Sequence, residues 1–185
     1  MVAAKLDISE QFFWGVSIMI RQADAWEHSS HGAKGAFGNT LAAHFHLKES
    51  EHVSTAWPGG NPFAITRVHS DTGIPDRTTT PPSEAALLIG VSLLPLPPRA
   101  YEIWIDGKAI DVPYIPSLRT QVVDLQCDSS GWVGVGFDYV HYRVPKAGLD
   151  EIARNHGVKP ISSYRFVICE HDIALAQLTQ YVLPS

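Results

Sequence analysis

Apolar and polar positions alternate on both sides of Asp106-Gly107, and this pattern predicts a β-hairpin over residues 101–112. An Asp-Gly pair readily adopts the positive φ angles that a two-residue type I′ turn requires. One face of the hairpin is then apolar, whereas the other carries Glu102 and Asp111, so a shift of register by one residue would bury both carboxylates. The predicted cross-strand partners are Ile105 with Lys108, Ile103 with Ile110, and Tyr101 with Val112.

The same kind of pattern predicts several further strands. Residues 85–94 form an uninterrupted apolar run, which is typical of a strand buried on both faces. Residues 128–131 are expected to turn the chain, and Gly134 and Gly136 are expected to mark a bend in the strand that follows. The strands outside the hairpin are predicted over residues 53–57, 63–69, 85–94, 120–126 and 132–144.

Helical periodicity is concentrated near the C-terminus. Pro145 suits the first position of a helix that Gly157 ends, and Asp172 suits the N-cap of a last helix that runs to Leu183. A short helix is also expected from Asn39 to Leu47. Strands followed by helices indicate an antiparallel α+β domain.

Composition and charge exclude some functions. The 185 residues, 45% of them hydrophobic, suit one domain, and a net charge of -5 argues against direct binding of nucleic acid, which requires clustered Lys and Arg. The apolar run over 12–20 is too short to span a bilayer and lacks a signal-peptide cleavage pattern, so a cytoplasmic location without membrane contact is expected. Cys127 and Cys169 have no partner motif, and both are expected to be reduced.

Two segments resemble a known family. Tyr101-Glu-Ile-Trp-Ile-Asp-Gly107 and Phe137-Asp-Tyr-Val-His-Tyr-Arg-Val-Pro-Lys-Ala-Gly-Leu-Asp-Glu-Ile-Ala153 resemble the N-terminal sensor domain of AraC-type transcriptional regulators. The resemblance extends more loosely from about Gly38 to Leu183. Its motifs are mainly structural, so they do not specify a ligand.

This resemblance implies an α+β, mainly β fold: a cupin-like antiparallel β-barrel (jelly roll) followed by C-terminal helices. Residues 1–37 would be an N-terminal extension, 38–144 the barrel, and 145–185 a helical segment for packing or dimerisation. The barrel would bind a small-molecule effector without a cofactor, and two copies would form a homodimer. DNA binding would belong to a C-terminal helix-turn-helix domain that this chain is not expected to contain.

An effector site requires a concave apolar pocket with a few placed polar groups. Polar or aromatic residues that interrupt apolar strands are the candidates for these groups. Glu102 and Trp104 share a hairpin face that either lines the pocket or forms an outer surface. For His141 and Arg67 the plainer interpretations are a satisfied, partly buried histidine and an ion-pair partner. The candidate ligand-binding residues are Arg67, His69, Glu102, Trp104, Tyr139 and His141.

An alternative hypothesis is a metal-dependent cupin enzyme. His44, His46 and Glu51 match the first half of the metal-cupin pattern, in which two histidines and a glutamate hold a divalent metal. The second half, with its third histidine, is missing. If residues 41–46 are helical, His44 and His46 point about 200° apart and cannot bind one ion. No catalytic residue is otherwise indicated.

The last helix carries an apolar stripe of Leu175, Leu178 and Val182, which are the candidates for a dimer contact. The equally weighted alternative is burial of this stripe against the chain's own barrel. The leading hypothesis is therefore a ligand-sensing and dimerising module of an AraC-like regulator. The alternatives are the metal-dependent enzyme and a stand-alone binding protein.

Overall fold

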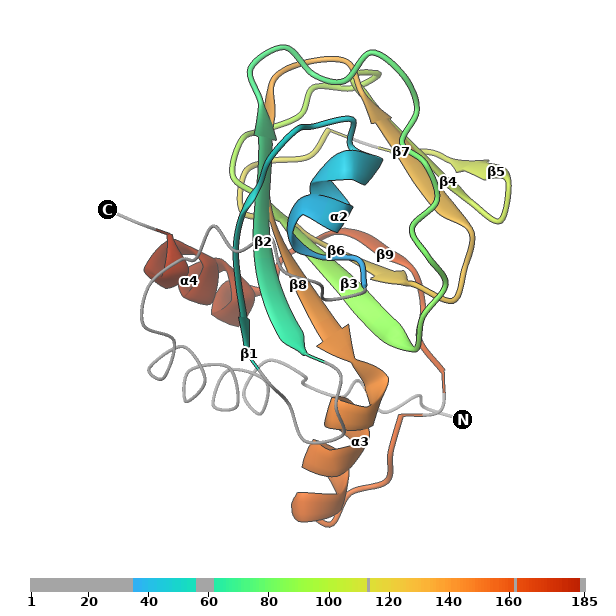
Figure 1. The fold of residues 1–185 in the computed structure, drawn as a ribbon, viewed down its shortest axis with the longest axis vertical. Helices are drawn as coiled ribbons and strands as arrows, with labels where there is room; N and C mark the ends of the chain where they lie inside the picture. The colour runs from blue at the N-terminus through green and yellow to red at the C-terminus, as the bar shows by residue number, and fades with distance from the viewer. Residues whose placement is uncertain (1–34, 56–61, 113, 162, 184–185) are drawn as a thin grey trace.

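The computed structural model describes residues 35–55, 62–112, 114–161 and 163–183, which form two antiparallel sheets with helices around them (Figure 1). The helices are α2 (Gly38–His44), α3 (Lys146–Asn155) and α4 (Ile173–Val182). The strands are β1 (Glu51–Thr55), β2 (Phe63–Ser70), β3 (Ala86–Ser92), β4 (Tyr101–Ile105), β5 (Lys108–Ile110), β6 (Thr120–Asp124), β7 (Ser129–Val133), β8 (Phe137–Pro145) and β9 (Val167–Glu170).

The larger sheet has the strand order β1-β2-β8-β3-β6-β9, and the smaller sheet has the order β5-β4-β7. Several neighbours in the larger sheet, such as β2 and β8, are far apart in sequence. The chain therefore crosses repeatedly between the sheets, as in a jelly roll. The predicted mainly β, antiparallel α+β class is confirmed.

The predicted hairpin is present as β4 and β5. Both turn residues have positive φ, 49° at Asp106 and 74° at Gly107, as a type I′ turn requires. The register is confirmed for Ile105 with Lys108 and for Ile103 with Ile110, but the pairing of Tyr101 with Val112 does not form, because β5 ends at Ile110.

The strand predicted over 132–144 is divided between the two sheets. β7 begins at Ser129, so the prediction of a turn over 128–131 was wrong, and the chain turns just before it. Gly134 and Gly136 lie between β7 and β8. A Cβ added at Gly134 would lie 2.2 Å from the Trp132 ring. A Cβ added at Gly136 would lie 2.7 Å from the Asp71 carbonyl oxygen. These glycines allow the chain to leave one sheet and enter the other.

Alternate residues of the central strands contribute to two apolar cores. β3 is buried along its whole length, as its apolar run predicted. Leu88 faces the inner core between the two sheets, whereas Leu87 and Ile89 face an outer core on the other side of the larger sheet. The same division holds for β8, where Tyr139 faces inward and Tyr142 faces outward.

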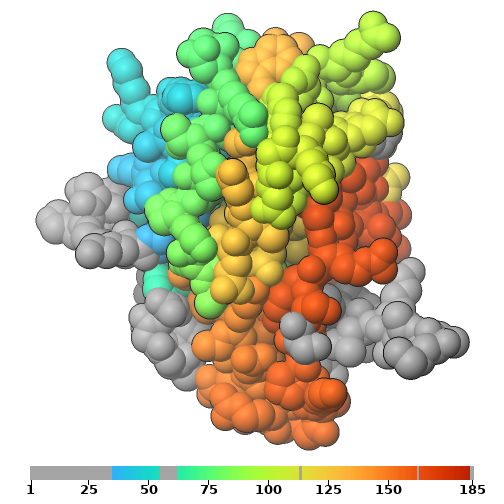
Figure 2. Space-filling view, turned by 90° about the vertical axis from the view of Figure 1, so that its right-hand side faces the viewer, coloured from blue at the N-terminus to red at the C-terminus, as the bar shows by residue number. Residues whose placement is uncertain are grey.

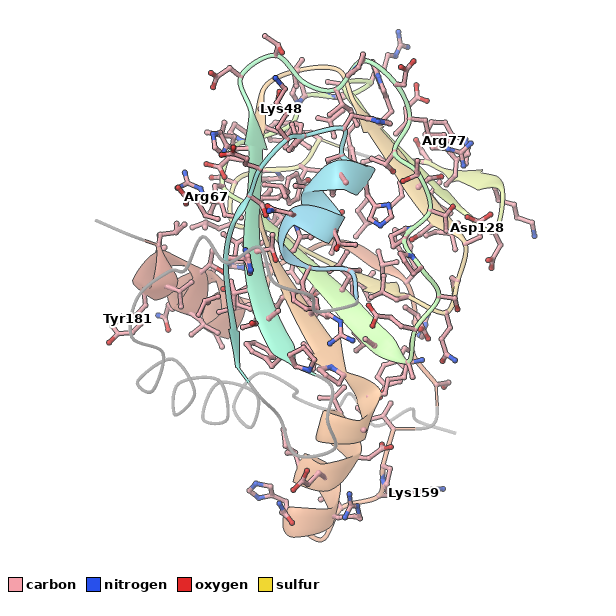
Figure 3. All side chains as sticks on the ribbon, in the orientation of Figure 1. Lys48, Arg67, Arg77, Asp128, Lys159 and Tyr181 are labelled. Atoms are coloured by element: carbon pink, nitrogen blue, oxygen red, sulfur yellow. The ribbon has the colours of Figure 1, made fainter. Side chains whose placement is uncertain are left out.

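α4 covers the outer core (Figure 1). The predicted N-cap is confirmed, since Asp172 Oδ1 accepts a hydrogen bond from the Leu175 backbone N–H at 2.9 Å. Leu175, Leu178 and Val182 are only 7, 2 and 8% exposed. The stripe is thus buried against the chain's own sheet, and these side chains are not available to a second copy. Tyr181 points away from the sheet (Figure 3).

The other elements differ from their predicted bounds. α2 ends at His44 rather than Leu47, and Asn39 does not cap it; the Asn39 side chain accepts instead from the Ser50 backbone N–H at 3.2 Å. Pro145 precedes α3 as its N-cap, and Gly157, with φ 66°, follows its end as predicted. β9 was not predicted and pairs with β6, so part of 145–185 belongs to the larger sheet.

The remaining sequence expectations concern the termini and the cysteines. Of the predicted extension 1–37, only 35–37 are described, and Ala36 and Phe37 are buried. Cys127 and Cys169 are free thiols, as predicted. In the described part of the chain, no helix is long and apolar enough to cross a membrane.

Candidate functional site

A cavity of about 70 Å³ lies between the two sheets. Strands β3, β6 and β8 form one wall, β4 and β7 form the other, and the end of α2 and residues 78–81 form the rim. In Figure 2 this loop is green and lies between the blue of α2 and the yellow-green of residues 95–112. The volume is roughly half of the ~150 Å³ at which an engineered apolar cavity admits benzene, so only a few heavy atoms fit without movement of the walls.

Two polar side chains of β8 line this cavity without a hydrogen-bond partner in the described structure. They are the hydroxyl of Tyr139 and Nδ1 of His141, on side chains that are 3 and 2% exposed. The two rings stack with centroids 5.5 Å apart, and Phe45 lies against His141 at 5.6 Å. A buried polar group without a partner costs ~1–3 kcal/mol, so a molecule or water in the cavity that bonds with these atoms would remove that cost.

Gln121 adds a further polar group to the same wall. The Tyr101 hydroxyl donates to Gln121 Oε1 at 2.8 Å and so joins the two sheets across the cavity. Gln121, Gly90 and His141 lie in one cross-strand row. An added Cβ at Gly90 would lie 2.8 Å from Gln121 Nε2 and 3.2 Å from His141 Nε2. Gly90 therefore leaves the room that these two side chains occupy.

The described lining of the cavity contains no residue that is normally charged at pH 7. None of the described residues that line it is Asp, Glu, Lys or Arg. Burial lowers the pKa of His141 to about 4 and also lowers the pKa of His44. Burial raises the pKa of Tyr101 and raises that of Tyr139 well above its ordinary value. At pH 7 these four side chains are uncharged.

Two histidines attach the rim loop to the end of α2. His44 Nδ1 lies 2.6 Å from the Thr79 hydroxyl, and His46 Nε2 donates to the Arg77 carbonyl oxygen at 3.0 Å. His44 also lines the cavity, and its Nε2 has no hydrogen-bond partner in the described structure. The rim thus adds a third unpaired nitrogen or oxygen to those of Tyr139 and His141.

The structure places the six candidate ligand-binding residues in different positions. Tyr139 and His141 line the cavity. Arg67 and His69 point to the opposite face of β2, because their positions alternate with the inward-facing Val68. Arg67 Nη2 donates to Asp138 Oδ2 at 2.7 Å, so the ion-pair interpretation of this residue is confirmed.

Glu102 and Trp104 lie on the outer face of the hairpin, which is one of the two alternatives that the pattern left open. Glu102 is exposed, and the Arg77 guanidinium lies 4.1 Å from the Trp104 ring centroid. Neither lines the cavity. The inward-facing residues of the same strand, Tyr101 and Ile103, line it instead.

The alternative metal site is not assembled, which corrects that interpretation. α2 ends at His44, and the rim contacts direct His44 and His46 to different partners. Glu51 lies on β1, 3.5 Å from Arg67 Nη1. The described ranges contain no group of three or more His, Cys, Asp or Glu side chains that is able to hold a metal ion.

The sequence patterns did not indicate Gln121, Tyr101 or Gly90 as parts of the site. Gln121 lies on the same face of β6 as the apolar Val123, which also lines the cavity, and a polar residue on this inward face was a possible signal. The sequence alone did not show which residues of different strands pair with one another, because β3, β6 and β8 are neighbours only in the folded chain.

No family model matches the chain, and the comparison with curated proteins found no match. Similar solved structures include the Cnp3 cupin domain of Schizosaccharomyces pombe, with 9% identity and a TM-score of 0.37 over 62% of this chain and 75% of that one. A cupin 2 conserved barrel domain protein from Salinispora arenicola has 13% identity and a TM-score of 0.36 over 58% and 85%. A cupin protein from Bacteroides fragilis has 12% identity and a TM-score of 0.30 over 66% and 86%.

These likenesses are distant and do not extend to function. The fold class rests on the strand arrangement, in which two antiparallel sheets enclose an inner core and a small cavity. The described residues form a jelly-roll-like arrangement of two antiparallel sheets, with α3 and α4 following the last long strand, β8.

Proposed function

We propose that this chain is a ligand-sensing module that binds a small molecule in the cavity between its two sheets. The observation that carries the proposal is that two side chains lining the cavity each hold a buried polar atom without a partner in the described structure, the Tyr139 hydroxyl and His141 Nδ1. A ligand that bonds with both removes the cost of leaving them unpaired. Apolar walls around a few polar groups are typical of small-molecule sites.

The construction of β8 supports a sensor. Tyr139 and His141 line the cavity on one face of this strand, while Tyr142 on the other face bonds with Thr179 of α4, with the two hydroxyl oxygens 2.8 Å apart. A ligand that moves β8 therefore acts directly on the packing of α4. The size of that response is limited by the ligand's preference for one arrangement of α4 over the other.

In the finer form of the proposal, the module belongs to an AraC-type regulator, where α4 passes the change to an attached DNA-binding unit. The segments that carry the resemblance support this form because they build β4 and β8, two of the strands that line the cavity, together with the turn after β4 and most of α3. A homodimer in such a regulator would use a surface other than the buried stripe of α4.

A thermal-shift screen of sugars, aromatic acids and metabolites tests the binding proposal, followed by calorimetry on each hit. A ligand of the cavity raises the melting temperature of the wild-type chain and binds Tyr139→Phe more weakly. Hydrogen exchange in α4 then changes when the ligand is added. Hits that bind the variant unchanged and leave α4 unaffected would count against the sensor proposal.

A further inference from the structure

The charge of the cavity wall restricts what the proposed site accepts. The wall supplies hydroxyl, imidazole and carboxamide groups, and none of its described residues is Asp, Glu, Lys or Arg. Arg143 pairs with Glu84: Arg143 Nε lies 3.1 Å from both carboxylate oxygens, and Nη1 donates to the Pro62 carbonyl oxygen. The Arg77 guanidinium is already engaged by the Oγ of the lining residue Ser130, which accepts from Nε at 2.7 Å, and Arg77 itself does not line the cavity. No unpaired charge is therefore offered to a ligand by these residues.

Burial keeps the cavity's own titratable groups neutral as well. His141, whose pKa is lowered to about 4, and Tyr139, whose pKa is raised, change charge only outside the physiological pH range. Transfer of an ionised group into such surroundings costs several kcal/mol unless an opposite charge meets it. A neutral polar group needs only hydrogen bonds.

The hydrogen-bonding groups of the cavity wall determine which kind of neutral ligand group the site is suited to bind. The Tyr139 hydroxyl donates or accepts, and the unpartnered His141 Nδ1 does either according to its tautomer. The Gln121 carboxamide, whose oxygen accepts from Tyr101, lies in the same cross-strand row as His141. Amides and hydroxyl compounds, which both donate and accept, match this set.

We infer that the cavity selects small uncharged molecules with an amide or hydroxyl group, bonded to Tyr139 and His141, and excludes ionised molecules of the same shape. This inference rests on the proposed function and deepens it. The volume of about 70 Å³ limits the bound group to a few heavy atoms. Larger ligands require displacement of the rim, where Phe45 lies against His141.

The test is a matched pair of probes, propionamide and sodium propionate, which have the same shape and differ in charge. Each is titrated into the full chain at pH 7 and equal ionic strength, and the NMR signals of the Gln121 carboxamide and the His141 ring are followed. Propionamide is expected to give a saturable shift of both signals. Propionate is expected to bind at least tenfold more weakly, which corresponds to ~1.4 kcal/mol.

Two tyrosine variants make the test specific to the cavity. Tyr139→Phe removes a hydroxyl that has no partner in the described structure, so the fold is expected to keep its stability while the affinity for propionamide falls about fivefold to tenfold. Tyr181→Phe makes the same chemical change on a side chain that is 74% exposed on α4, and is expected to leave the affinity unchanged.

Two results would overturn the inference. Equal or tighter binding of propionate at the same signals would show that the ligand class is wrong, while ligand binding in the barrel would stand. Absence of any shift with propionamide would also reject the inferred class. The proposed function would then be decided separately by the thermal-shift screen and the response of α4.

Discussion

At the scale of single residues, His141 makes the free energy of unfolding depend on pH. Its pKa is about 4 in the folded chain against 6.5 for a free histidine, so the unfolded chain takes up the proton first as the pH falls. The free energy of unfolding is therefore expected to decrease between about pH 6.5 and pH 4, by at most ~1.4 kcal/mol per pH unit from this group. Urea denaturation at several pH values measures this slope.

The matched control for this prediction is His141→Gln, which keeps a polar side chain and removes the titration. Of the described groups that line the cavity with His141, only His44 is also expected to titrate near this range, and the variant retains it. The variant should therefore show a smaller loss of stability on acidification. Parallel pH profiles for the two proteins would contradict the burial of a neutral His141.

The buried ion pair between Arg143 and Glu84 gives a second prediction at this scale. Arg143 is 2% exposed, and the Glu84 carboxylate also accepts the Ala36 backbone N–H at 2.9 Å. Glu84→Gln leaves a buried guanidinium without its counter-charge, so a loss of ~3–5 kcal/mol in the free energy of unfolding is expected from urea denaturation.

The more exposed pair of Arg67 and Glu51 provides the comparison for this loss. Their side chains are 27 and 37% exposed, and Arg67 retains Asp138 as a second partner. Glu51→Gln is therefore expected to change the free energy of unfolding by less than ~1 kcal/mol. Similar losses for the two substitutions would mean that burial does not decide the strength of these pairs.

At the scale of elements, the hairpin turn offers a test of how the backbone conformation of one residue affects the free energy of unfolding. Gly107 has φ 74°, and an added Cβ there would meet nothing within 4 Å. Gly107→Ala is thus expected to lower the free energy of unfolding by ~1–2 kcal/mol through the left-handed backbone alone. Thermal denaturation measures the loss, and Lys108→Ala, an exposed neighbour in β5, should be nearly neutral. A neutral Gly107→Ala would mean that the turn changes type.

Elements were predictable where the signal was local. The Asp-Gly turn, the Asp172 cap and the Gly157 terminus each depend on a few neighbouring residues, and the structure contains all three. β9 gave no such signal, because its half-buried residues do not alternate clearly and its place depends on pairing with β6. The division of 132–144 was also missed, since the pattern of apolar residues does not record which sheet a strand joins.

At the scale of the whole molecule, the site was predictable only in part. The alternating pattern in β2 correctly assigned Arg67 and Thr66 to opposite faces of the strand, but it did not show which of the two faces points inward. That choice depends on α4 covering one face and the smaller sheet covering the other. Tyr139 and His141 were found because β8 is polar at positions that face the cavity. Gln121 and Gly90 required the three-strand register.

The whole molecule also determines how the two cores unfold. The inner and outer cores use opposite faces of the same strands, β2, β3 and β8, so neither core is able to melt while the other keeps its packing. A single cooperative transition is therefore expected, although the buried apolar residues of α4 pack in the outer core. Leu125 and Leu178 test this, because both are 2% exposed and they lie in the inner and the outer core respectively.

Leu125→Ala and Leu178→Ala make the same change in the two cores. Each is expected to lower the free energy of unfolding by ~2–5 kcal/mol. In each variant the transitions followed by circular dichroism and by Trp fluorescence should coincide. Early melting of α4 in Leu178→Ala, with the Trp signal unchanged, would show that the outer core is an independent unit. In that case β8 would be a poor route from the cavity to α4, because α4 would loosen without any response from the strands that line the site.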